Sequence, residues 1–167
     1  MPAVITEPEV VEHGPYCVVG AYATFEGEDE GPAWEAAWAT LEGRLGEVTN
    51  RVGDAILGFL YRPHRDDPTV PQAVRACFVG VEVTDLASVP EGMAATRFSG
   101  GRFAAVRCVG GTEDESAAAV GDAVALLERW VAERGWREGD SCFCFSRELE
   151  PRPPFVEHVH LKIEEVG

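Results

Sequence analysis

The feature that most constrains the fold of this chain is an internal repeat. GPYCVV at 14–19 aligns with GRFAAV at 101–106 at an offset of 87 residues, and VGDAILGF at 52–59 aligns with EGDSCFCF at 138–145 at an offset of 86. Each copy reads as strand, helix, strand, strand. Because one copy alone would leave a strand edge and a sheet face uncovered, the two copies should associate about a pseudo-two-fold axis.

Hydrophobic periodicity gives the expected elements. Strand patterns cover 9–26, with a break at Gly14-Pro15, and 93–109, with a break at Gly100-Gly101. The segments 55–61 and 74–83 are expected to form one hairpin, and 142–145 and 156–163 a second. One helix follows Pro32, with an apolar stripe at i, i+3 and i+4 spacing, and a second helix covers 113–134. The stripe of the first helix consists of Trp34, Ala37, Trp38, Leu41, Leu45 and Val48.

These patterns predict an α+β fold of duplicated β-α-β-β modules. One module covers about 5–84 and the other about 91–167, and together they form a single domain over 1–167. The sheets are antiparallel, both main helices lie on one side of them, and a central ligand cleft lies where the two modules meet. Clefts of this kind are common sites for small molecules.

Charge and hydropathy exclude several function classes. The chain has 29 acidic and 14 basic residues and a net charge of −15, which disfavours direct binding to nucleic acid. It has no apolar run of about 20 residues and no signal-peptide pattern, so we expect no membrane partner and a cytoplasmic location. The five cysteines are scattered through strand-like segments, which indicates buried, reduced thiols.

Several segments together resemble a known family. They are PEVVEHGPYCVVGAY, GPAWEAAWATLEGRL, GFLYRPHRDDP, VPEGMAATRFSGGRFAAVRCVGG and VEHVHLKI, of which PEG followed by SGGRFAAVRCVG is the most specific. Over essentially its whole length the chain resembles the GyrI-like small-molecule-binding domains, the effector-binding domains of bacterial multidrug-responsive and AraC-type activators. The resemblance implies a cleft that binds bulky, often cationic, aromatic compounds.

The resemblance also implies a buried carboxylate near the start of the last strand. Placement by eye assigns this position to Glu157, whereas alignment of the alternating apolar residues of the strand assigns it to His158. Adjacent strand residues face opposite ways, so one of the two points into the cleft. On the preceding strand, Cys144 and Ser146 stand where the family commonly has an acidic residue and a tyrosine.

A Cys-x-Cys and a His-x-His pattern form the sharpest chemical feature of the sequence. If Cys144 lies opposite His158 on antiparallel strands, then Cys142 lies opposite His160, and four zinc-type ligands share one face. A flat patch on two strands is nevertheless unlike the usual loop-held zinc site. We therefore expect no metal and no other cofactor, with buried thiols and cleft-lining histidines instead. His13 and His64 are interpreted as solvated.

Aromatic residues are expected to divide between the core and the cleft. Trp38 lies on the helix stripe and is assigned to the core. Tyr22, Tyr61 and Phe78 are assigned to the cleft, where aromatic walls attract lipophilic cations. The predicted ligand-binding set is therefore Tyr22, Tyr61, Phe78, Cys144, Glu157, His158 and His160.

Three functions are compatible with these features. The leading one is a stand-alone protein that binds hydrophobic, cationic or polyaromatic small molecules, for sequestration or for sensing on behalf of an unidentified protein partner. The second is a hydrolase that opens strained electrophilic rings of DNA-alkylating natural products, with Glu157 or His158 as base and Tyr61 or His160 orienting the substrate. The third is a gyrase-inhibitor-like protein interaction module.

Overall fold

The computed structural model describes residues 2–63, 68–69, 71, 74–148 and 150–164, without the side chains of 140–142, so His64 lies outside the described residues. The chain groups into two compact units. We call residues 15–99 unit A, and residues 1–14 with 100–167 unit B. The first 14 residues thus group with the second half of the chain, and the module bounds 5–84 and 91–167 stay a prediction from the repeat.

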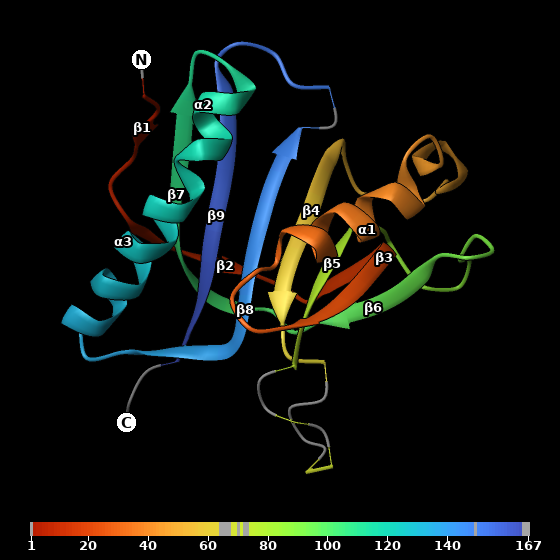
Figure 1. The fold of residues 1–167 in the computed structure, drawn as a ribbon, viewed down its shortest axis with the longest axis horizontal. Coiled ribbons are helices and arrows are strands. Elements are labelled where there is room, and N and C mark those ends of the chain that lie inside the picture. The colour runs from red at the N-terminus through yellow and green to blue at the C-terminus, as the bar shows by residue number, and fades with distance from the viewer. Residues whose placement is uncertain (1, 64–67, 70, 72–73, 149, 165–167) are drawn as a thin grey trace. The chain divides into compact units, whose positions relative to one another are not determined.

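Among its described residues, unit A contains four antiparallel strands and one α-helix (Figure 1). The strand β5 (Val74–Glu82) pairs with β4 (Ala55–Tyr61) on one side and with β3 (Tyr16–Glu26) on the other. A fourth strand, β6 (Ala94–Phe98), pairs with the other edge of β3. The helix α1 (Gly31–Leu41) packs on β3 and β5.

The first helix is shorter than its apolar stripe predicts. It ends at Leu41 because Gly43 adopts a left-handed conformation, with φ of 76°. Leu45 and Val48 are buried, yet they belong to the 3₁₀ turn η1 (Leu45–Glu47) and its end rather than to the helix. The buried helix positions are Ala33, Ala37 and Leu41. Trp38, which was assigned to the core, remains partly exposed.

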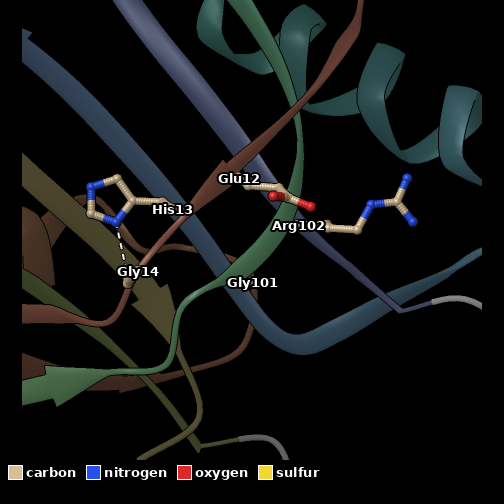
Figure 2. Close-up of a pocket in the computed structure, with 5 residues that line it drawn as sticks. All are labelled: Glu12, His13, Gly14, Gly101 and Arg102. Atoms are coloured by element: carbon tan, nitrogen blue, oxygen red, sulfur yellow. Dashed lines mark hydrogen bonds between the residues drawn. The ribbon is translucent and has the colours of Figure 1, made fainter.

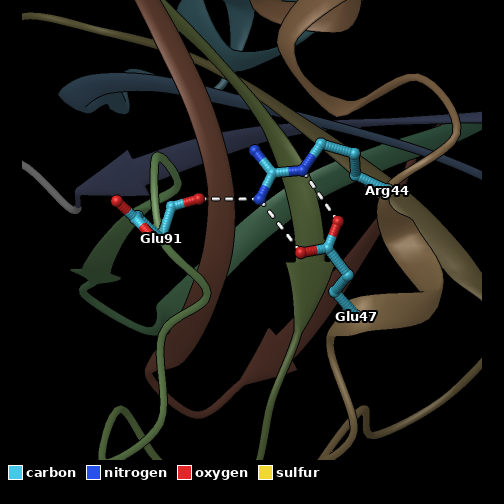
Figure 3. Close-up of polar contacts among 3 residues, drawn as sticks. All are labelled: Arg44, Glu47 and Glu91. Carbon is cyan, nitrogen blue, oxygen red and sulfur yellow. Dashed lines mark hydrogen bonds and ion pairs between the residues drawn. The ribbon is translucent and has the colours of Figure 1, made fainter.

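A polar contact ties η1 to the loop before β6 (Figure 3). The Arg44 guanidinium donates two hydrogen bonds to the Glu47 carboxylate, at 2.7 and 3.0 Å, and a third to the backbone carbonyl of Glu91, at 2.7 Å. The first of these contacts lowers the pKa of Glu47. The three hydrogen bonds of Arg44 together hold the loop at Glu91, just before β6, against the turn η1.

Strands β3 and β5 approach each other closely at a pair of glycines. Gly20 lies directly opposite Gly80. A Cβ atom at Gly20 would overlap the carbonyl oxygen of Val79, and one at Gly80 would overlap that of Val19. Neither position therefore accepts a side chain without a shift of the backbone.

The described part of unit B contains the remaining strands and two helices (Figure 1). Its middle strand β9 (Phe155–Glu164) pairs antiparallel with β8 (Arg137–Glu148) and with β7 (Gly101–Gly110). The short strands β1 (Val4–Ile5) and β2 (Glu9–His13) both pair with the other edge of β7. The helices α2 (Glu113–Ala118) and α3 (Val120–Glu133) pack on β7 and β9.

The second predicted helix is divided in two at Ala119. Thr112 caps its start, because the Thr112 hydroxyl accepts a hydrogen bond from the Glu115 amide, and the Glu115 carboxylate accepts one from the Gly111 amide. In α2, Ala117 is exposed, whereas Ser116 is buried. The buried positions of α3 are Ala123, Leu127 and Val131.

The predicted α+β fold with antiparallel strands is confirmed. The strand pattern over 93–109, with its break at Gly100-Gly101, forms two strands with different partners: β6 pairs with β3 in unit A, whereas β7 pairs with β1, β2 and β9 in unit B. The glycines at 100 and 101 separate two strands of different units rather than forming a hairpin turn. Within the described ranges, no helix has the length and apolar character needed to cross a membrane.

Candidate functional site: two sheet faces with different chemistry

Strand alternation divides the unit A sheet into a helix face and an opposite face. The Cys77 thiol marks the helix face, because the nearby Glu30, just before α1, adds to the burial that raises its pKa to about 12. Residues of the opposite parity therefore lie away from α1. Six of them are aromatic: Tyr16, Tyr22, Phe59, Tyr61, Phe78 and Phe98.

These six rings form one connected layer, which we call the aromatic face. The Phe98 ring contacts three of the other rings. The Phe59 ring is stacked on it at a centroid distance of 4.0 Å, and the Tyr61 and Phe78 rings lie edge-on to it at 4.9 and 5.8 Å. Tyr22 lies parallel to Phe78 at 6.5 Å. Phe78 is 1% exposed and Tyr22 is 54% exposed, so the layer runs from the core to a solvent-accessible ring.

The same alternation divides the unit B sheet. Cys108 lies opposite Glu157 on the helix face, and the carboxylates of Glu157 and of Asp122 in α3 add to the burial that raises the pKa of Cys108 to about 11. His158 and His160 have the opposite parity, so they lie on the face away from the helices. We call this the imidazole face. The two residues between which the sequence did not decide, Glu157 and His158, thus point to opposite sides of the sheet.

Glu157 is a largely buried carboxylate on the helix face. Burial raises its pKa, and Arg147, whose guanidinium lies 4.0 Å from the carboxylate, opposes that rise. The Glu157 side chain is 14% exposed and that of Arg147 is 44% exposed. Glu157 is therefore an ion-pair partner of Arg147 on the side of the sheet that the helices cover.

The two histidines of the imidazole face are neutral at pH 7. Burial, with smaller contributions from His158 and His13, lowers the pKa of His160 to about 4. Burial and Arg107 lower the pKa of His158, whereas Glu148 opposes this. The His158 and His160 ring centroids lie 6.4 Å apart, and the Phe103 ring lies 6.2 Å from His160.

The register of β8 and β9 differs from the one that the zinc hypothesis requires. Cys144 lies opposite His160, and Ser146 lies opposite His158, so the pairing is shifted by two residues from the register considered above. The side chain of Cys142 is outside the description. Among the described residues, no group of three or more His, Cys, Asp or Glu side chains is placed to hold a metal ion.

A separate hollow of about 330 Å³ lies in unit B where β2 ends and β7 begins (Figure 2). Glu12, His13, Gly14, Gly101 and Arg102 line it. The His13 ring donates a hydrogen bond from Nδ1 to the Gly14 carbonyl, at 2.5 Å, and the Arg102 guanidinium lies 5.4 Å from the Trp136 ring centroid. No residue of the predicted ligand-binding set lines this hollow.

The structure places the predicted residues in two groups within their own units. Tyr22, Tyr61 and Phe78 share the aromatic face, whereas Cys144, His158 and His160 share the imidazole face. Sequence reasoning missed Tyr16, Phe59 and Phe98. Strand parity applied to every aromatic residue of unit A, together with the pairing of β3 with β6, was the signal that identifies them.

Comparison with known proteins gives likenesses of fold. No protein-family model and no curated protein matches the sequence. The solved structure of SAV2435 bound to tetraphenylphosphonium is similar, with a TM-score of 0.73 and 13% identity over 95% of this chain and 94% of that one. The EcmrR C-terminal domain has a TM-score of 0.61 and 13% identity, covering 96% of this chain and 98% of that one. A hydrolase from Listeria innocua has a TM-score of 0.55 and 15% identity, covering 95% and 92%.

The chain therefore has the fold of the GyrI-like small-molecule-binding domains, as the sequence resemblance implied. The similar structures include a protein bound to the aromatic cation tetraphenylphosphonium and the C-terminal domain of EcmrR. At 13–15% identity these likenesses concern the fold, and the chemistry of the site follows from the side chains of this chain.

Proposed function

We propose that the protein binds small aromatic molecules and that the aromatic face of unit A supplies the stacking surface. The observation that carries this proposal is the half-exposed Tyr22 ring, which lies parallel to the buried Phe78 ring on the neighbouring strand. An exposed ring held on a rigid aromatic layer attracts flat apolar ligands and lipophilic cations without much loss of side-chain entropy. The likeness to SAV2435, which binds tetraphenylphosphonium, supports the same class of ligand.

The biological role proposed for this binding is sequestration of a toxic compound, or its detection for a protein partner. Multidrug binding, cytoplasmic location and a ligand range that covers cationic and uncharged polyaromatic molecules all belong to the proposal. The net charge of −15 favours cations at long range. The aromatic face carries none of this charge itself, because its six described side chains are Tyr and Phe.

Isothermal titration with tetraphenylphosphonium tests the proposal. We expect saturable binding to the wild-type protein and about tenfold weaker binding to Tyr22→Ala, because about 1.4 kcal/mol of stacking and cation–π attraction is lost.

Phe25→Ala is the matched control. Phe25 is in the same strand as Tyr22 but on the helix face, where the Arg75 guanidinium lies 4.8 Å from its ring centroid. This variant should bind as the wild type does. Equal losses in both variants, or absence of wild-type binding, would contradict the proposal.

A hydrolase is the second candidate, and the neutral imidazoles of His158 and His160 favour it. A general base must be unprotonated, and both histidines are unprotonated at pH 7. A pKa of about 4 nevertheless makes His160 a weak base, so we place ligand binding first. Incubation with styrene oxide tests this function: water would add to one ring carbon as its C–O bond breaks, giving the diol, and His158→Gln should abolish the rate enhancement.

A further inference from the structure

The imidazole face contains a buried nitrogen without a hydrogen-bond partner. This nitrogen is Nδ1 of His160. It has essentially no exposed surface, so bulk water does not satisfy it. A buried polar atom left unpaired costs about 1–3 kcal/mol, and such atoms are uncommon in folded proteins. The position is therefore destabilising unless a bound group completes the hydrogen bond.

The surroundings of this nitrogen are mostly apolar. His160 lies between Ala105 of β7 and Cys144 of β8 in the sheet, and both of these residues are buried. The buried ring of Phe103, on the same face, lies 6.2 Å from the imidazole. A ligand that approaches Nδ1 therefore meets an aromatic and aliphatic wall with one polar atom in it.

The charged groups around His160 disfavour a cationic ligand at this point. Lys162 follows on the same face of β9, and Arg107 of β7 lies opposite His158. The carboxylates with the same parity, Glu148 of β8, Glu164 of β9 and Glu9 of β2, are exposed. The buried carboxylate Glu157 lies on the other side of the sheet.

We propose that Nδ1 of His160 hydrogen-bonds an uncharged hydroxyl group on an aromatic ligand, so that the protein selects phenol-like molecules over cations of the same shape. This inference rests on the proposed function, because it names the ligand class for an aromatic-binding protein. A hydroxyl group both donates and accepts, so it complements Nδ1 in either neutral tautomer of the imidazole. Because the pKa of His160 is lowered to about 4, its imidazole is neutral at pH 7.

Three probes of one shape test the inference on the full chain: naphthalene, 2-naphthol and 2-naphthylmethylammonium. We expect 2-naphthol to bind the wild-type protein about tenfold more tightly than either of the others at pH 7, which corresponds to about 1.4 kcal/mol. His160→Phe should bind naphthalene as the wild type does and should lose the preference for 2-naphthol. His160→Leu serves the same purpose if the phenylalanine variant does not fold.

His13→Gln is the matched control, since His13 is an exposed histidine whose ring is already bonded to the Gly14 carbonyl. It should keep the preference. Binding of tetraphenylphosphonium and of all three probes with equal affinity would overturn this inference and leave the proposed function standing. Tighter binding of 2-naphthylmethylammonium than of 2-naphthol would also overturn it. If neither tetraphenylphosphonium nor any naphthalene probe binds, the proposed function itself is contradicted.

Discussion

The middle strand of each unit lies between the corresponding two strands of that unit, but the side chains on the face away from the helices differ in chemistry between the units. In unit A, β5 lies between β4 and β3, and one row across the sheet reads Phe59, Phe78, Tyr22. In unit B, β9 lies between β8 and β7, and a row on the corresponding face reads Cys144, His160, Ala105. One row is a stack of rings, and the other contains an unpaired imidazole nitrogen.

The helix faces of the same two sheets are alike. In unit A, Val19, Val81 and Cys77 are buried on the side of α1, and in unit B, Val106, Val159 and Leu161 are buried on the side of α2 and α3. Apolar burial against a helix leaves little choice of residue type. The comparison indicates that the helix faces maintain the duplicated fold, whereas the opposite faces were free to diverge toward a site.

The largest expected effect is on the aromatic row. Phe78→Ala should lower the free energy of unfolding by about 3–5 kcal/mol, because it removes a fully buried ring and leaves a cavity. Tyr22→Ala, which removes the exposed ring of the same pair, should cost about 1 kcal/mol. Urea denaturation measures both. Similar losses in the two variants would show that the row is not layered from core to surface.

The next largest expected effect is a pH dependence of the free energy of unfolding, caused by His160 in the row of unit B. The unfolded His160 has an ordinary pKa of 6.5 and the folded one about 4, so the unfolded state binds more protons between these values. Stability contributed by this residue is therefore fully present above pH 6.5 and falls as the pH drops toward 4. At 1.36 kcal/mol for each pH unit between the two pKa values, the loss amounts to about 3 kcal/mol.

Chemical denaturation of the wild type and of His160→Gln from pH 4 to pH 7 checks this. The difference between the two proteins should change with pH in the stated direction. A difference that is constant across the range would contradict it, because carboxylate titration elsewhere is common to both proteins.

A smaller effect on the free energy of unfolding is expected when a phenylalanine replaces the middle residue of the unit B row. His160→Phe should raise the free energy of unfolding at pH 7 by about 1 kcal/mol, because it removes the unpaired nitrogen beside Phe103. His158→Phe is the comparison, since no unpaired buried atom is found on His158 among the described residues. It should give no gain. A loss of stability in His160→Phe would indicate that the nitrogen is satisfied in solution.

The smallest effect concerns the helix faces, which should behave alike. Burial raises the pKa of Cys77 to about 12 and that of Cys108 to about 11, so both thiols remain protonated at pH 8. Iodoacetamide should therefore alkylate the partly exposed Cys17 before either of them. Peptide mass mapping after short exposure gives the order. Early modification of Cys77 or Cys108 would show that one helix face opens more readily than the other.

Much of the fold was predictable from local sequence. The bounds of β4, β5 and β9 agree with the predicted apolar segments within a residue, because β4 and β5 are largely continuous apolar runs of strand length and β9 alternates. The helix ends were predicted less well. An apolar stripe continues past Leu41, yet Gly43 ends the helix there, and periodicity alone does not detect a left-handed glycine.

The site was predictable in part. Tyr22, Tyr61 and Phe78 were assigned together from their residue types, and they share one sheet face. Phe98 was missed because its role depends on the pairing of β6 with β3, whose registered residues are 74 to 82 positions apart in the chain. The zinc hypothesis assumed a register of β8 and β9 that differs by two residues from the one observed.

The sequence by itself determined the repeated β-α-β-β pattern, the antiparallel α+β fold and the alternation of side chains along the regular strands, because these follow from local periodicity. It did not determine which parity faces a helix. That is decided by long-range packing of α2 and α3 on β7 and β9, which turns Glu157 toward the helices and His158 and His160 away from them. Only the tertiary structure therefore shows that an imidazole, and not this carboxylate, lies on the face away from the helices.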